Sequence, residues 1–275
     1  MDFYIGLLQV IGVHTLLGLS AWCILHTGQV SLAQGGFFAI GAYVAGMLTA
    51  MAGWPLGLAL LTAALIASLI AIAIGFPALR VKGLMLVVAT TAFAEIVRLV
   101  FFNLKWQVQT PNGPIGPDGG LGFGGIRYVP ANAWSGLEIL ALIWSLVAAV
   151  MLALWMLDRS RIGTLWRAVG EDEVAAQSAG INLTAAKVSA FGIGGAIAGL
   201  AGFLFGVKDG YVNPELLSWH MSGAVLIMII LGGLGRLRGA LIGAFAFALL
   251  QEFFKSEAVF GAFAKHWNID RKSTR

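Results

Sequence analysis

Three consecutive acidic residues lie in the only stretch of the chain with the composition of a soluble protein, residues 158–186. They are Glu171, Asp172 and Glu173. Acidic side chains are favoured in the first turn of a helix, and glycine suits the left-handed position after the last turn. With Gly170 as a cap and Gly180 after the end, the pattern predicts a helix of about nine residues, roughly 13 Å long.

Two interpretations of this helix remain open from the residues alone. It is either an ordinary surface helix that crosses a loop, or a rigid peg that docks into a separate protein such as an ATPase. Small residues on one face, Ala175, Ala176 and Ala179, permit close docking, and the acidic end offers charge pairing. The residues that such a coupling contact would use are Glu171, Asp172, Glu173, Ala175, Ala176 and Gly180.

An acid–base pair, Glu95 and Arg98, interrupts the apolar run 84–102. Counted from Gly83, Glu95 lies about 18 Å along a helix. Ionisable residues at such depth in a membrane are costly and often functional. Because the two residues are three positions apart, they can also satisfy each other within the helix. The pair is therefore either structural, which we expect, or part of a translocation pathway.

Polar side chains also precede the second apolar run, at Gln29, Ser31 and Gln34. Together with the glycines of segment 28–43, they are compatible with an unwound start that lines a cavity in a translocation pathway. The simpler alternative is a helix that begins at the membrane surface, with these groups in water.

Four glycines, at spacings of four, three and four residues, form one stripe on a later span. They are Gly195, Gly199, Gly202 and Gly206. Small residues at helical spacing allow close helix packing in membranes. We expect packing within the subunit, with a subunit interface or a pore-lining bend as the alternative.

Several kinds of chemistry are absent from the sequence. It holds no Gly-Lys dipeptide, and therefore no phosphate-binding loop of the Walker type. The four histidines have no carboxylate or cysteine at ligand spacing, and no Gly-x-Ser-x-Gly motif occurs. We expect no metal, no cofactor and no enzymatic activity of its own. The formal charge of +4 comes from scattered basic residues, so membrane lipid is an expected partner and nucleic acid is not.

The composition indicates a membrane protein. Hydrophobic residues make up 59% of the chain and charged residues 11%, whereas a soluble domain has about 25% charged residues. Apolar runs recur that are long enough to cross about 30 Å of hydrocarbon. We predict an all-α, polytopic transmembrane helix bundle, one permease-type domain over residues 1–275 with about eight spans. The expected spans are 3–25, 30–52, 56–76, 84–102, 135–157, 187–207, 219–231 and 240–254.

Basic residues predict the orientation of these spans. They concentrate in the third, fifth and seventh loops, which places the N-terminus outside and the odd loops in the cytoplasm. Segment 103–134 is then a long external loop, and 158–186 a cytoplasmic loop that carries the predicted coupling helix. The polar tail 268–275 is an exception, because eight spans would leave its basic residues outside.

Four stretches of the sequence together resemble the permease subunits of branched-chain amino acid ABC importers. The stretches are 28–43, 79–98, 166–202 and 231–243. The third, which contains Trp166-Arg-Ala-Val-Gly-Glu-Asp-Glu173, is the most specific. The chain departs from the family at Gly170, where arginine is common, and at its polar tail, where the family usually continues into one more span that ends inside. The misplaced basic residues are what a missing last span would leave.

The resemblance implies a set of partners and a location. A second homologous permease subunit, two ATP-binding-cassette ATPases and a periplasmic or extracellular substrate-binding protein are expected, in a bacterial inner (plasma) membrane. The solute would be a branched-chain or hydrophobic amino acid or a related small solute such as urea or an amide. The resemblance also favours the coupling interpretation of segment 171–180.

Other classes of function remain as alternatives. A stand-alone secondary transporter or channel would show inverted halves with paired broken helices, and the two halves of this chain show no convincing repeat. A membrane scaffold without transport is a third possibility, against which the polar start of the second span argues weakly.

Overall fold

The computed structural model describes residues 2–78, 81, 83–110, 113–126, 134–215, 217–233 and 235–255. The helices among them are α1 (Asp2–Leu25), α2 (Gln34–Gly46), the π-helical turn η1 (Met47–Met51), α3 (Leu56–Ala78), α4 (Leu84–Asn103), the 3₁₀ turn η2 (Gly119–Leu121), α6 (Gly136–Asp158), α7 (Arg161–Glu171), α8 (Glu173–Ser178), α9 (Leu183–Asp209), α10 (Trp219–Gly232) and α11 (Leu237–Lys255). The predicted tail 268–275 lies outside the described residues.

Six of the described helices are long and apolar enough to cross a membrane. They are α1, α2 with η1, α3, α4, α6 and α9. The helices α10 and α11 add a seventh span only if they are counted as one element, which is bent by 113°. The predicted number of eight is therefore not confirmed. With 14 residues, α10 is about 21 Å long, too short to span the hydrocarbon alone.

The helix α9 lies at the centre of the bundle and packs against α1, α2 and α3. The face that α3 turns inward consists of small residues four positions apart. They are Ala59, Ala63, Ala67, Ala71 and Gly75, all of which are buried. Without bulky side chains between them, the two helix backbones approach closely and gain contact along their length.

The predicted glycine stripe of α9 meets two different helices. A Cβ atom added to Gly199 would lie 2.5 Å from the Cβ of Ala67 on α3. One added to Gly206 would lie 2.8 Å from the carbonyl oxygen of Ala42 on α2. Gly195 likewise faces α3, and Gly202 faces α2. All four glycines therefore lie where α9 closely approaches another helix of the same chain.

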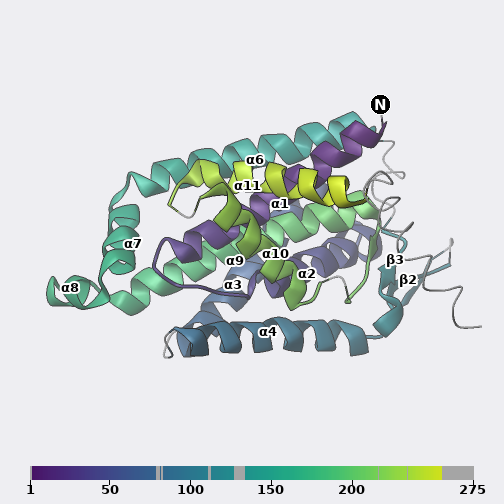
Figure 1. Ribbon diagram of the computed structural model, residues 1–275. Coiled ribbons are helices and arrows are strands. Elements are labelled where there is room, and N and C mark those ends of the chain that lie inside the picture. Colours follow the sequence, from purple (N-terminus) through teal and green to yellow (C-terminus); the bar gives the residue numbers. More distant parts are fainter. Residues whose placement is uncertain are drawn as a thin grey trace, which may run out of the picture.

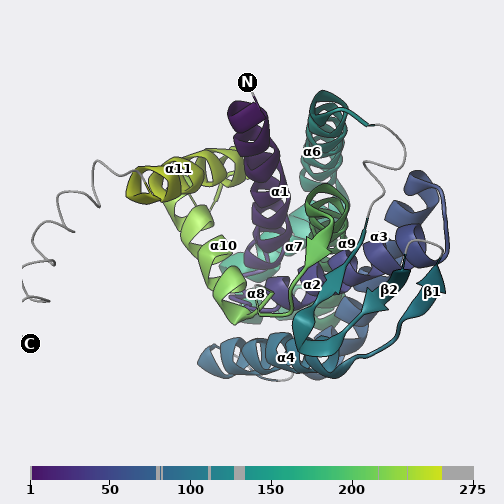
Figure 2. The same cartoon turned by 90° about the vertical axis from the view of Figure 1, so that its right-hand side faces the viewer.

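The elements are distributed between two ends of the bundle. The short helices α7 and α8 lie at one end, and the strands lie at the opposite end (Figure 1). The helices α4 and α6 run along opposite edges, with α1, α2 and α9 between them (Figures 1 and 2). The loop after α1, the start of α4 and the start of α9 are all on the side of α7 and α8.

A small antiparallel sheet occupies the other end, where the sequence predicts only a long loop. Its strands are β1 (Val108–Thr110), β2 (Gly113–Pro117), β3 (Phe123–Gly124) and β4 (Tyr211–Val212), in that order. The pairing of Phe123 with Val212 joins the loop after α4 to the end of α9. Phe123 is fully buried, and its ring lies where a side chain on Gly46 would be, so the sheet is anchored on α2.

Candidate coupling site

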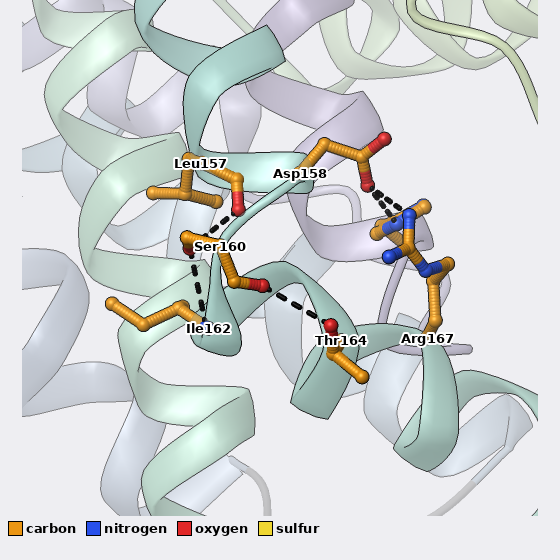
Figure 3. Close-up of polar contacts among 7 residues, drawn as sticks. Leu157, Asp158, Ser160, Ile162, Thr164 and Arg167 are labelled. Carbon is orange, nitrogen blue, oxygen red and sulfur yellow. Dashed lines mark hydrogen bonds and ion pairs between the residues drawn. The ribbon is translucent and has the colours of Figure 1, made fainter.

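The turn between α6 and α7 is held by the side chain of Ser160. Its hydroxyl donates to the carbonyl of Leu157 at 2.6 Å and accepts from the backbone N–H of Ile162 at 3.2 Å (Figure 3). Thr164 donates its hydroxyl to the carbonyl of Ser160 at 3.1 Å. Serine is favoured at this position because its oxygen satisfies an N–H group that the first turn of a helix leaves unpaired.

Two residues of α7 bring the helix close to the bundle. A Cβ atom on Gly163 would lie 2.5 Å from the Cα of Asp158, so the tight turn requires glycine there. Trp166 is fully buried and donates its indole N–H to the hydroxyl of Ser189 on α9 at 3.0 Å. The helix α7 is thus fixed against both α6 and α9.

The last residue of α6, Asp158, connects α7 to the end of α1. One of its carboxylate oxygens lies 2.9 Å from Arg167 on α7 and 3.0 Å from Nε2 of His26, which follows α1 (Figure 3 shows the contact with Arg167). The imidazole of His26 stacks on Trp22 with ring centres 4.4 Å apart. Burial lowers the pKa of His26, and the carboxylate of Asp158 partly opposes this shift.

Gly170 lies within α7 and is not the cap of the acidic helix, which corrects the sequence prediction. A Cβ atom on Gly170 would lie 2.6 Å from the carbonyl oxygen of His26 and 3.2 Å from the backbone nitrogen of Gly28. The glycine permits α7 to cross the loop after α1 at close range. This is a physical reason for glycine where arginine is common in the family.

The predicted nine-residue helix is interrupted at Asp172. This residue has an extended backbone, φ −153° and ψ 109°, and it ends α7 and begins α8. Its carboxylate accepts the backbone N–H groups of Val174 at 2.8 Å and Ala175 at 3.1 Å. Glu171 therefore belongs to the last turn of α7, and only Glu173 lies in the first turn of α8. The side chain of aspartate competes with the helix for these donors, so it favours a cap over a continuous helix.

Gly180 has the left-handed conformation that the sequence predicts, with φ +82°. Its N–H bonds to the carbonyl of Gln177, and the N–H of Ile181 bonds to that of Ala176, both at 3.0 Å. These two hydrogen bonds form a Schellman motif, which ends α8 and turns the chain toward α9. Asn182 then caps α9 by accepting from the backbone of Ala185 at 3.0 Å.

The faces of α8 differ from the predicted small face. Ala176 is 4% exposed because it is turned toward the bundle, whereas Ala175 and Ala179 are exposed. Val174 is 72% exposed, a large fraction for an apolar side chain at the end of the molecule. The surface that α8 presents is therefore formed by Val174, Ala175 and their exposed neighbours, without Ala176.

An ion pair ties α8 to the start of α9. The ammonium of Lys187, whose side chain is 5% exposed, donates to Glu173 at 2.5 Å. Both residues line a cavity of about 280 Å³ that Gln29 and the first turns of α4 also line. A charge so deeply buried requires a partner of opposite charge. Lys187 is not among the predicted site residues, although a lysine among the apolar residues of a span is the signal that could have indicated it.

The segment of residues 29–33 before α2 is not helical, and its polar residues are buried, as is Gln34 at the start of α2. Gln29, Ser31 and Gln34 are 5%, 1% and 1% exposed, so the alternative in which they lie in water is wrong. The hydroxyl of Thr90 on α4 accepts the backbone N–H of Leu32 at 3.0 Å, which satisfies one donor of the extended segment. Of the three predicted residues, Gln29 lines the cavity described above.

Glu95 and Arg98 bond to each other on α4. Nε and Nη2 of Arg98 lie 2.9 and 2.6 Å from the same oxygen of Glu95. The side chain of Glu95 is 37% exposed and that of Arg98 is 21% exposed. Of the predicted pathway residues, Gln29 shares a cavity with the coupling residue Glu173, whereas Glu95 and Arg98 do not line that cavity.

Comparisons with known proteins agree with the resemblance in the sequence. The model of the family described as branched-chain amino acid transport system permease component matches residues 3–264. The branched-chain amino acid permease protein LivM of Salmonella typhimurium (strain LT2) is 32% identical over 264 residues, which cover 89% of this chain and 60% of LivM. No solved structure matches the chain.

Two further relatives match over different parts of the chain. LivH of Escherichia coli (strain K12), from a branched-chain amino acid transport system, is 36% identical over 113 residues, or 40% of this chain and 36% of LivH. The autoinducer 2 import permease LsrC of Photorhabdus laumondii is 23% identical over 241 residues, or 84% of this chain and 67% of LsrC. The chain spans about 60% of the length of LivM. It belongs to the family of branched-chain amino acid transport system permease components.

Proposed function

We propose that this chain is the membrane-spanning permease subunit of an ATP-driven importer, and that α8 is its contact with an ATPase. One observation carries the proposal: a six-residue helix lies at one end of an apolar bundle, exposes Val174 by 72%, and is fixed to the bundle on both sides. The apolar side chain of Val174 stands on this rigid support and is available for contact with a partner protein.

Rigidity is what a coupling contact requires. Asp172 caps α8 at its start, the Schellman motif at Gly180 ends it, and Glu173 ties it to α9 through Lys187. A partner that displaces α8 therefore moves α9 at the centre of the bundle with it. Through α7 and Asp158 the same displacement reaches the end of α1.

The family suggests the remaining components. We propose a second homologous permease subunit, two ATP-binding-cassette ATPases and an external substrate-binding protein, in the inner (plasma) membrane of a bacterium. The positive-inside pattern supports an orientation with α7 and α8 in the cytoplasm and the sheet outside. The proposed solute is a branched-chain or hydrophobic amino acid, which the name of LivM supports, or a related small solute such as urea or an amide.

The test substitutes aspartate for Val174 in the assembled transporter. We expect the subunit to insert and to pair with its permease partner, whereas association with the ATPase falls roughly tenfold or more, equivalent to about 1.4 kcal/mol. The measurement is co-purification of the ATPase and stimulation of its ATP hydrolysis. Gly180→Val, which strains the left-handed turn, is a second variant with the same expected result.

A matched control places the same change at the other end of the molecule. Leu121 is 73% exposed and follows β2, so Leu121→Asp introduces the same charge away from the proposed contact. This variant should retain association with the ATPase. Normal association and hydrolysis with both Val174→Asp and Gly180→Val would contradict the proposal and make α8 an ordinary surface helix.

A further inference from the structure

The outer face of α6 is apolar near its end and finishes in a tryptophan and an arginine. Leu152, Trp155, Met156 and Arg159 follow one another at helical spacings of three and four residues, and the backbone of Arg159 is still helical. The four side chains therefore lie on one side of the helix. Leu152 and Met156 are 54% and 58% exposed, which in a membrane span is typical of a face in contact with lipid.

Trp155 and Arg159 mark the level at which this face leaves the hydrocarbon. The guanidinium carbon of Arg159 lies 3.9 Å from the centre of the Trp155 ring, a cation–π contact, and both side chains are exposed. Tryptophan is enriched at the boundary between hydrocarbon and lipid head groups, and a long arginine side chain carries its charge outward to that level. The end of α6 therefore lies at the membrane surface.

The helix α7 begins at Arg161, directly after this level, and runs across the end of the bundle (Figure 1). Its inner side packs on the bundle through the buried Trp166. Ile162 and Leu165, three residues apart, are 45% and 39% exposed, and Ile162 points away from Arg167 (Figure 3). Exposed apolar residues on a helix that runs along a membrane surface are typical of helices that lie partly among the lipids.

Two arginines, Arg159 and Arg161, flank the turn at Ser160 between the two helices. Both are exposed, and within the described part of the chain neither forms an ion pair. The carboxylate of the adjacent Asp158 is bound by Arg167 at 2.9 Å instead. A guanidinium binds phosphate through two parallel hydrogen bonds, and basic side chains near a membrane surface attract anionic lipids. The two guanidinium groups are therefore available to a phosphate at the level of the head groups.

We infer that Arg159 and Arg161 bind the head group of an anionic phospholipid, whose acyl chains lie along Leu152 and Met156 on α6. The phosphate accepts hydrogen bonds from the two guanidinium groups, and the ring of Trp155 holds Arg159 in place. The exposed apolar side of α7 enters the same lipid layer. Because the bound lipid contacts both sides of the turn between α6 and α7, it stabilises the position of α7 and of α8 beyond it.

The turn between α10 and α11 provides a matched comparison. Arg236 and Arg238 have the same spacing as the two arginines after α6, and both are exposed. Residues 228–238 contain no aromatic residue, so these arginines have no neighbour in the sequence that corresponds to Trp155. The two turns carry the same charge, and only the turn after α6 combines it with an interfacial tryptophan and an exposed apolar helix face.

The first test measures the binding of dioleoylphosphatidylglycerol, an anionic probe, to the assembled transporter in an uncharged detergent. The lipid is titrated, and bound copies are counted by native mass spectrometry. Arg159→Gln with Arg161→Gln should weaken the tightest binding of this lipid at least about tenfold. The control, Arg236→Gln with Arg238→Gln, removes the same charge and should retain the affinity. An unchanged affinity in the first variant, or an equal loss in both, overturns the inference.

The second test distinguishes a bound head group from a general attraction between charges. Arg159→Lys with Arg161→Lys keeps both positive charges but removes the paired hydrogen bonds of the guanidinium groups, so we expect an affinity between those of the unmodified protein and the glutamine variant. Trp155→Leu removes the ring beneath Arg159 and should weaken binding about threefold. An affinity of the lysine variant equal to that of the unmodified protein overturns the inference, because charge alone would then explain the binding.

The same glutamine variant also tests the alternative in which these arginines contact a protein. If lipid binding is unchanged while less ATPase co-purifies, the arginines belong to the protein contact and the inference is wrong. The function proposed for α8 is tested separately, by Val174→Asp. Its failure would leave the lipid measurement unaffected, since the head group is bound at the turn between α6 and α7.

Discussion

In the centre of the bundle, α9 meets its neighbours through glycine and alanine, whereas α7 and α8 at the end are held by side-chain hydrogen bonds and ion pairs. Contact between small residues depends on the absence of side-chain atoms. The α7–α8 unit depends on particular polar groups, such as Asp158, Asp172 and Glu173. Added volume should therefore disrupt the centre, and lost polar groups should loosen the end without unfolding the bundle.

The largest loss of stability is expected for a substitution of Gly202 in the centre of the bundle. A Cβ atom there would overlap the backbone carbonyl of Phe38 on α2, which cannot move without displacing the helix. Gly202→Val should lower the free energy of unfolding by about 3 kcal/mol or more. Thermal unfolding in detergent measures the loss. Gly223→Val, where a Cβ atom meets no neighbour within 4 Å, is the control and should be close to the unmodified protein.

Substitutions at Glu95 and Arg98 test whether a polar contact within a membrane span contributes as much to the free energy of unfolding as helix packing does. Replacement of either residue alone by alanine leaves one charge without its partner and should cost about 3 kcal/mol. The variant with the two residues exchanged should recover much of this loss, because the ion pair is kept. Equal stability of the single and exchanged variants in thermal unfolding would show that the pair does not stabilise the fold.

Substitutions at two glycines near α8 distinguish the cost of a close atomic contact, at Gly170, from the cost of a strained backbone, at Gly180. Gly170→Ala places a Cβ atom 2.6 Å from the carbonyl of His26, so we expect a loss of about 1 to 3 kcal/mol. Gly180→Ala meets no neighbour within 4 Å and should cost only the left-handed conformation, about 1 kcal/mol. A larger loss for Gly180→Ala would contradict the close crossing of α7 over the loop after α1.

The smallest effect is a pH dependence at His26. Burial lowers the pKa of this histidine in the folded protein below its ordinary value of 6.5, so the folded state favours the neutral imidazole. As the pH falls below about 6.5, the unfolded chain binds the proton first, and stability is lost until the pH passes the lowered pKa. His26→Gln should remove this part of the acid dependence of thermal unfolding. An unchanged slope between the two proteins would contradict it.

Much of the fold depends on local patterns and was predicted from them. Apolar runs such as 3–25 and 56–76 are confirmed as helices long enough to span a membrane, because a run of that length has no other stable arrangement in lipid. Gly180 has the predicted left-handed geometry, because the preference for glycine after the last turn of a helix depends only on the local backbone. The family was also predicted, from motifs that are local in the sequence.

Contacts between distant segments were decided only by the tertiary structure. The apolar runs predict eight spans. The described part of the structure has six helices that are long enough to span a membrane, or seven spans if α10, which has 14 residues, is counted together with α11 across the 113° bend between them. Glu173 pairs with Lys187, a partner 14 positions away. Gly170 belongs to α7 because that helix crosses the loop at His26. Residue types alone do not specify which distant backbones approach each other, since that depends on the packing of the whole bundle.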